Sequence, residues 1–167
     1  MSILVVGASG FIGKNLLLEM PRKWNVYGVY RSSPDFLSFL EKNELTNVQP
    51  LKCDLGNLKE VEVVMAGLKE IDVCVYLVAN TSVGRLIEDP ILDVDTNISP
   101  LLNFLRCFRG RKLIFLSSGA VYMGLKREIS PKSKINPTIP YAISKYACEL
   151  YIKFYQSVKK TFKEYVI

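Results

Sequence analysis

The sequence predicts an α/β fold built on a doubly wound parallel sheet. Short β-branched runs alternate with longer amphipathic stretches along the 167 residues, an order that favours parallel strands with helices on both faces. The runs are almost continuously apolar, which is typical of strands covered on both sides. A chain of this length corresponds to one domain with a sizeable core.

Each predicted element follows from a local pattern. Strands are expected in runs rich in Val, Ile, Leu, Tyr or Phe, at 3–7, 25–30, 47–52, 72–78 and 112–117. Helices are expected in segments of helical periodicity, at 11–20, 35–43, 57–67, 90–108 and 141–160. Pro21 and Gly67 would end the first and third helices, and Asp89-Pro90 and Pro140-Tyr141 would begin the fourth and fifth. The segment 124–139 has little periodicity and is expected to be a loop.

Composition narrows the class of protein. With 49% hydrophobic and 23% charged residues, the chain resembles an ordinary soluble globular domain. No apolar run approaches the roughly 18 residues that cross a bilayer, and no signal peptide is recognised at the N-terminus. We therefore expect a cytoplasmic protein without a membrane partner. The four cysteines show no close pairing and are expected to be free thiols.

The titratable residues limit the chemistry. The chain has no histidine, which excludes a Ser-His-Asp triad, histidine-ligated zinc and an imidazole base. Proton transfer must therefore use Tyr, Lys, Ser, Cys or carboxylates. The net charge of +6 favours an anionic cofactor and substrate. No recognition motif accompanies this charge, so a nucleic-acid partner is not expected.

A glycine-rich turn follows the first predicted strand and opens the first predicted helix. Its spacing is Gly7-x-x-Gly10-x-x-Gly13. Gly7 permits the tight turn, Gly10 lets the backbone approach a pyrophosphate, and Gly13 allows the helix to pack closely on the strand. The free N–H groups of the helix start, including Phe11 and Ile12, can then hold phosphates. The alternative is a glycine-rich turn that binds nothing.

The residues after the second predicted strand bear on the choice of cofactor. An NAD enzyme usually has an acidic residue about 20 residues past the glycines, where it binds the ribose hydroxyls. This chain has Arg31-Ser32-Ser33 there, and these side chains can bind a 2′-phosphate. Asp35 comes too late and is expected to cap the next helix with Ser33. NADP is therefore favoured over NAD, unless Arg31 is only a solvated loop charge.

Further segments, together with the glycine turn, resemble the extended short-chain dehydrogenase/reductase family. The similarity is to its epimerase/dehydratase branch, which acts on nucleotide sugars. The segments are Cys53-Asp54-Leu55, Asp72–Ala79, Asn97, Ser117–Tyr122 and Pro140–Lys145. The chain departs from the family pattern where Tyr76 replaces a histidine, Val78 replaces an alanine and Met123 is inserted.

The resemblance implies a Rossmann sheet of strand order 3-2-1-4-5 and roles for particular residues. Asp54 would meet the adenine, and Leu55, Val78 and Ala79 would join the cofactor site. Tyr141 would exchange a proton with a substrate hydroxyl while hydride moves to or from the nicotinamide. Lys145 would favour the phenolate and hydrogen-bond the nicotinamide ribose. Ser118 would hold the reacting oxygen, and Asn97 would complete the catalytic set.

Simpler interpretations of the catalytic set remain open. The Tyr-x-x-x-Lys spacing occurs at Tyr122/Lys126, Tyr141/Lys145 and Tyr155/Lys159, and only the second opens a helix after the fifth predicted strand. That pair could be an ordinary pair on a helix surface. Ser118 could be a plain strand-end hydroxyl, and Asn97 a buried polar residue that bonds a helix carbonyl.

The last residues, Lys163–Ile167, look like the first residues of a sixth strand that would cover the fifth poorly. In the family a substrate domain follows that strand. The chain is therefore expected to be the dinucleotide-binding domain, 1–167, without its C-terminal substrate domain. It should bind cofactor but turn over a nucleotide sugar poorly. The alternative is a non-catalytic dinucleotide-binding or interaction module.

Relatives dimerise through the fourth and fifth helices, which implies a homodimer. Apolar positions on these helices would form the interface, unless they face the sheet. They are Leu101, Phe104, Leu105, Phe108, Ala147, Leu150, Tyr151 and Phe154.

Overall fold

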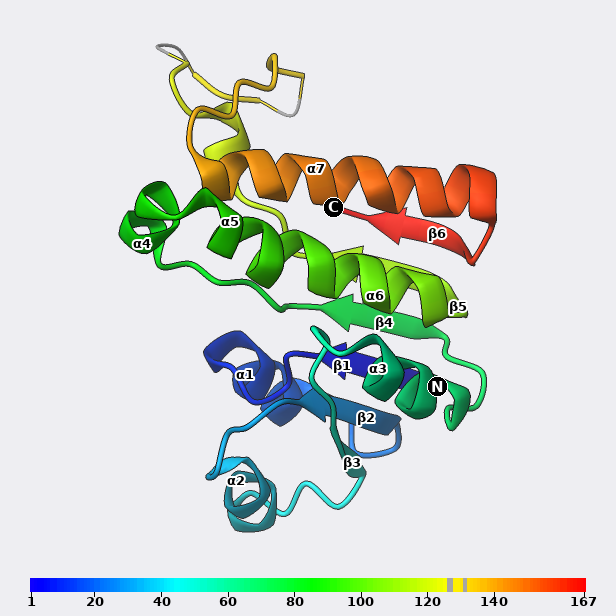
Figure 1. Cartoon of the computed structure of the whole chain (residues 1–167). Coiled ribbons are helices and arrows are strands. Elements are labelled where there is room, and N and C mark those ends of the chain that lie inside the picture. Colours follow the sequence, from blue (N-terminus) through cyan, green and yellow to red (C-terminus); the bar gives the residue numbers. More distant parts are fainter. Residues whose placement is uncertain (126–127, 131) are drawn as a thin grey trace.

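A six-stranded parallel sheet forms the centre of the molecule, with strand order β3-β2-β1-β4-β5-β6 (Figure 1). The computed structural model describes residues 1–125, 128–130 and 132–167. The strands are β1 (Ser2–Val6), β2 (Asn25–Tyr30), β3 (Val48–Lys52), β4 (Val73–Tyr76), β5 (Gly110–Phe115) and β6 (Phe162–Val166). The predicted α/β class and the order of the first five strands are confirmed.

Helical segments connect the strands. The α-helices are α1 (Phe11–Glu19), α2 (Phe36–Lys42), α3 (Leu58–Ala66), α4 (Val83–Glu88), α5 (Pro90–Asp93), α6 (Ser99–Cys107) and α7 (Pro140–Phe154). Two π-helical turns, η1 (Val94–Ile98) and η3 (Tyr155–Lys159), and a 3₁₀ turn, η2 (Gly119–Tyr122), complete the connections. None of the described helices is both long and apolar enough to traverse a bilayer.

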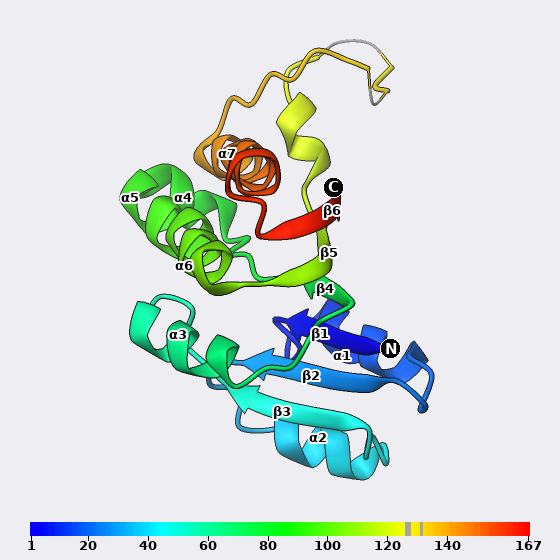
Figure 2. The same ribbon diagram turned by 90° about the vertical axis from the view of Figure 1, so that its right-hand side faces the viewer.

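The sheet is covered on both faces because its side chains alternate. In β1, Leu4 and Val6 join one buried cluster with residues of α3, α6 and α7, whereas Ile3 and Val5 join a second cluster with residues of α1 and α2. Figure 2 shows these two groups of helices on opposite sides of the sheet. This arrangement accounts for the near-continuous apolar strands.

The sixth strand is more complete than the sequence suggests. β6 pairs with β5 in parallel, from Gly110 opposite Phe162 to Ile114 opposite Val166. The expected sixth strand is therefore confirmed. It starts one residue earlier than predicted, at Phe162, whose ring is buried against Phe108 at a centroid distance of 6.1 Å.

The connection after β4 also differs from its prediction. The expected helix over 90–108 is divided into α5, η1 and α6, and α4 precedes it without having been predicted. Asp89 caps α5 by accepting from the N–H groups of Ile91 and Leu92, each at 3.1 Å, with Pro90 in the first turn. The predicted helix start at Asp89-Pro90 is therefore correct, and the helical backbone continues to Cys107 with the π-helical turn η1 in its middle.

The expected helix over 141–160 agrees with the structure at both ends. It begins at Pro140 as α7 and continues beyond Phe154 as the π-helical turn η3, which ends at Lys159. The expected loop over 124–139 contains no helix or strand in its described part; Lys126, Arg127 and Pro131 lie outside the described residues, and with them half of the Tyr122/Lys126 pair. All four cysteines are free, and three of them are buried.

Candidate functional site

A cleft of about 740 Å³ lies at the carboxyl ends of β1, β2, β3 and β4. Seven of the predicted cofactor residues line it: Gly7, Gly10, Arg31, Asp54, Leu55, Val78 and Ala79. The lining also includes residues that were not expected from the sequence: Ser9, Asn80, Asp95, Thr96 and Pro100. A polar run directly after a buried strand was the available signal for Asn80. The carboxyl edge of an open parallel sheet is the usual place for a ligand.

The glycine turn is shaped by contacts within the backbone. Gly7 has φ of +90°, a conformation that favours glycine. The N–H groups of Gly7 and Ala8 donate to the carbonyl of Val29 at 3.0 and 2.9 Å, which ties the turn to β2. The turn therefore presents the start of α1 beside the end of β2.

Gly10 and Gly13 differ in how much space surrounds them. A Cβ on Gly13 would lie 2.4 Å from the carbonyl oxygen of Gly7 and 2.7 Å from that of Ala8, whereas one on Gly10 would lie 3.4 Å from the Gly7 oxygen. Gly13 is therefore packed against the turn, and Gly10 leaves a cradle open at the cleft. Phe11 and Ile12 are 85% and 50% exposed, and their first-turn N–H groups can hold an anion.

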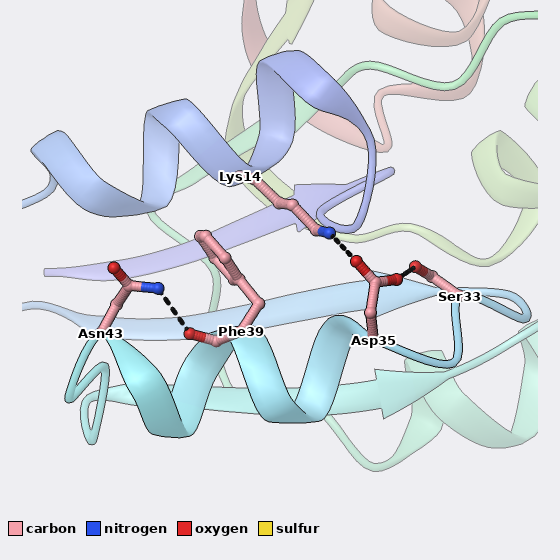
Figure 3. Close-up of polar contacts among 5 residues, drawn as sticks. All are labelled: Lys14, Ser33, Asp35, Phe39 and Asn43. Carbon is pink, nitrogen blue, oxygen red and sulfur yellow. Dashed lines mark hydrogen bonds and ion pairs between the residues drawn. The ribbon is translucent and has the colours of Figure 1, made fainter.

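The loop after β2 contains a polar cluster that the sequence did not reveal (Figure 3). Asp35 forms no capping hydrogen bond with α2, so that prediction was wrong. Its Oδ2 instead lies 2.5 Å from Lys14 Nζ, and its Oδ1 accepts from Ser33 Oγ at 2.6 Å. These two partners lower the pKa of Asp35 to about 2. Ser32 is exposed on the same loop.

Asn97 is placed in η1, away from the lining of the cleft. Its amide pairs with the main chain of Asn80, accepting from the N–H at 2.7 Å and donating to the carbonyl at 3.1 Å. The same amide nitrogen donates to Asp93 Oδ1 at 2.7 Å. Asn97 therefore holds the segment after β4 in position, and its side chain bonds a loop rather than a helix carbonyl.

Asp93 is a buried carboxylate that links three elements, and sequence reasoning missed it. It is 1% exposed and accepts from Asn97 through Oδ1 and from the hydroxyl of Ser144, on α7, through Oδ2. Ser144 directly precedes Lys145 in the sequence. The lone acidic residue between the apolar residues Leu92 and Val94 was the only sequence signal for this link.

The predicted catalytic residues lie beyond the end of β5 and do not line the cleft at β1–β4. Ser118 begins η2, and its Oγ accepts from the N–H of Ala120 at 3.2 Å. Tyr141 lies in the first turn of α7 and is half-buried. Tyr155 and Lys159 lie in η3, at the opposite end of α7.

Lys145 is nearly enclosed, with 4% of its surface exposed. Its Nζ donates to the carbonyl of Leu116 at 2.7 Å and lies 4.7 Å from the ring centroid of Phe115 and 6.0 Å from that of Tyr141. Burial lowers the pKa of Lys145. The ammonium group is therefore held next to the Tyr141 ring by the end of β5.

Comparison with known proteins identifies relatives. The family model described as NAD dependent epimerase/dehydratase family matches residues 3–162. A UDP-glucuronate 4-epimerase of Thermodesulfobacterium geofontis is 28% identical over 88% of this chain and 49% of its own length. A dTDP-D-glucose 4,6-dehydratase of Dictyostelium discoideum is 27% identical over 99% of this chain and 42% of its own length.

Solved structures agree with these relatives. The complex of Thermus thermophilus UDP-glucose 4-epimerase with NAD superposes with a TM-score of 0.78 at 28% identity, covering 98% of this chain and 53% of that chain. This chain spans about half the length of the curated relatives it matches. Because the family model extends from β1 into β6, the chain belongs to the NAD-dependent epimerase/dehydratase family.

Proposed function

We propose that this chain is the dinucleotide-binding domain of an NAD(P)-dependent epimerase or dehydratase acting on a nucleotide sugar. One observation carries this proposal: seven residues predicted to bind the cofactor line the same cleft, although they come from the four connections that follow β1, β2, β3 and β4. The open cradle at Gly10 fits the close approach of a pyrophosphate. The names of the curated relatives support a nucleotide sugar as the substrate class.

Each part of the cleft has a role in this proposal. The first-turn N–H groups of α1 bind the pyrophosphate, and Asp54 and Leu55 contact the adenosine end. Arg31 and Ser32 favour NADP over NAD, because a guanidinium binds a 2′-phosphate strongly. Val78 and Ala79 lie along the cofactor at the end of β4. When bound, the nicotinamide supplies hydride transfer.

The proposed catalytic set acts at the end of β5. Tyr141 moves a proton to or from a hydroxyl of the sugar, and Ser118 donates a hydrogen bond to the same oxygen. The Lys145 ammonium, 6.0 Å from the Tyr141 ring centroid, stabilises a phenolate there. Asn97 contributes indirectly, because its amide fixes the main chain of Asn80 at the cleft.

Orientation and exclusion of water contribute much to catalysis. We propose that the described elements bind the cofactor and orient the groups that transfer the proton.

We also propose a homodimer through exposed positions of α7. Leu150, Tyr151 and Phe154 are 51%, 41% and 41% exposed. The four positions expected to contribute from α6 and its end, Leu101, Phe104, Leu105 and Phe108, instead form part of the buried core. That part of the expected interface was wrong, because these side chains face the sheet.

The proposed function is tested by calorimetric titration of the purified chain with NADP+ and NAD+ in parallel. We expect micromolar binding of both cofactors, with NADP+ preferred. Tighter binding of NAD+ would support the cleft as the cofactor site but contradict the proposed role of Arg31. Absence of binding by either cofactor would reject the proposal and favour an interaction module.

A second prediction separates function from stability at Lys145. Replacing it with methionine removes a buried charge whose desolvation is unfavourable, so we expect the free energy of unfolding to stay within about 1 kcal/mol of wild type or to rise. We also propose that the Lys145 ammonium hydrogen-bonds the nicotinamide ribose. Cofactor affinity should therefore fall by about 10- to 100-fold, since a charged hydrogen bond contributes roughly 1.5–3 kcal/mol. Chemical denaturation and calorimetry measure the two effects. A large loss of stability with unchanged affinity would show that Lys145 is structural.

A further inference from the structure

The polar cluster of Lys14, Ser33 and Asp35 joins α1 to the loop after β2. It lies outside the lining of the proposed cofactor cleft, a few residues along the chain from Gly10 and Arg31, which do line it. Lys14 stands in the first turn of α1, directly after the glycine turn, and Ser33 and Asp35 follow Arg31 in the loop after β2. Figure 3 shows the Lys14 side chain extending across to Asp35. The ion pair therefore spans the boundary between the phosphate-binding turn and the loop expected to face the adenosine ribose.

Lys14 is held in this direction by its own packing. Helical side chains tilt toward the N-terminus of their helix, which brings the Lys14 ammonium back toward the glycine turn. Its side chain is 22% exposed, and Nζ lies 5.2 Å from the ring centroid of Phe39 on α2. The ammonium is thus a positioned cation rather than a freely solvated one.

Asp35 has both carboxylate oxygens occupied. One accepts from Ser33 Oγ at 2.6 Å, and the other contacts Lys14 Nζ at 2.5 Å. A carboxylate that binds the two hydroxyls of a ribose needs both oxygens free for them. The Asp35 side chain is 65% exposed, and an exposed ion pair contributes at most about 1 kcal/mol, so a more strongly charged anion can replace Asp35.

We propose that Lys14 is a cofactor-discriminating residue and that Asp35 is its internal competitor: the 2′-phosphate of NADP displaces Asp35 and binds Lys14, Arg31 and Ser33. This inference rests on the proposed function, since it requires a dinucleotide in the cleft. A phosphate monoester carries nearly two negative charges and three acceptor oxygens, so it outcompetes a single carboxylate for these donors. NAD has no such group and leaves the Lys14–Asp35 pair intact.

Three variants test the competition by calorimetry with NADP+ and NAD+. Asp35→Asn frees Lys14 and removes a like charge from the site, so NADP+ should bind about three- to tenfold more tightly and NAD+ should change by less than about twofold. Lys14→Met should weaken NADP+ binding by about five- to tenfold. In the double variant, Asp35→Asn should give a smaller gain than it gives alone, because only the removal of the negative charge then remains.

Glu164→Gln provides the matched control. It removes one negative charge from the exposed Lys112–Glu164 pair on β5 and β6, whose N–O distance is 3.5 Å. A general effect of net charge on an anionic ligand would appear in this variant too. We expect it to leave the ratio of NADP+ to NAD+ affinity unchanged.

A second measurement follows the carboxylate itself. The pKa of Asp35 is held at about 2 in the free chain, largely by Lys14, and should rise toward the ordinary value of 3.8 with saturating NADP+ but not with NAD+. Carbon-detected NMR titration of the Asp35 carboxyl group measures this pKa. If Asp35→Asn leaves the ratio of NADP+ to NAD+ affinity unchanged, or if it weakens NAD+ binding, the inference is overturned. The cleft would still stand as the proposed cofactor site. Wild-type chain that binds neither cofactor overturns the proposed function as well.

Discussion

Replacing Gly13 with alanine is expected to lower the free energy of unfolding by about 2 kcal/mol, because overpacking a tight site costs about 1–3 kcal/mol. The new methyl group would lie 2.4 and 2.7 Å from two backbone carbonyl oxygens, which belong to the turn and cannot move as a side chain can. Alanine is the better helix former by about 1 kcal/mol, and this gain offsets part of the steric cost. Cofactor affinity should fall as well, because α1 must shift away from the glycine turn.

Thermal unfolding measures the effect. In a domain of this size, each kcal/mol lowers Tm by about 2–4 °C. Gly84→Ala is the control for glycine replacement in a helix, since a Cβ there meets nothing within 4 Å, and it should be neutral or slightly stabilising. Gly10→Ala should keep the fold but weaken cofactor binding, because its methyl group would enter the cradle. Equal stability of the Gly13 and Gly84 variants would contradict the packing argument.

Replacing Asp93 with alanine is expected to cost about 3 kcal/mol of stability, as breaking a buried charged network typically does. The change leaves the Ser144 hydroxyl and one amide proton of Asn97 without their acceptor inside the protein. Asn97 then holds Asn80 less firmly, so cofactor affinity should also fall. Urea denaturation gives the stability, and calorimetry gives the affinity.

Asp89→Ala is the matched control, because Asp89 lies in the same segment but only caps α5 from an exposed position. Its loss should cost about 1 kcal/mol and leave cofactor affinity unchanged. In a double-mutant cycle, Asp93→Ala and Ser144→Ala should be non-additive by at least about 0.5 kcal/mol. Additive costs would mean that the two side chains do not act together.

The strands and the glycine turn could be predicted because their signals are local. A continuous apolar run and a glycine pattern at fixed spacing are each contained in a few consecutive residues. The π-helical turn η1 could not be predicted, since its contacts involve distant partners: Asn97 pairs with Asn80, and its carbonyl accepts from Cys148 Sγ at 3.5 Å. A sequence window over 90–108 contains neither partner.

The candidate site was predictable in its lining but not in its internal contacts. Aspartate is a residue type that is common at helix N-caps, which made Asp35 a candidate cap. Its actual partner, Lys14, lies 21 residues away in the sequence and is brought close only by the packing of α1 beside α2. The burial of Lys145 likewise follows from where α7 lies against Leu116. These contacts depend on tertiary packing, which overrides local preference when a charged group can find a partner.

The buried carboxylate of Asp93 has a consequence for how the molecule fluctuates. Through Asn97 it reaches the main chain at the cleft, and through Ser144 it reaches the helix that carries Tyr141 and Lys145. Opening either side exposes the same unsatisfied carboxylate, so the two sides should open as one cooperative unit. A ligand that binds at the end of β4 would then also restrain α7, and with it Tyr141 and Lys145, for which we propose a role in proton transfer.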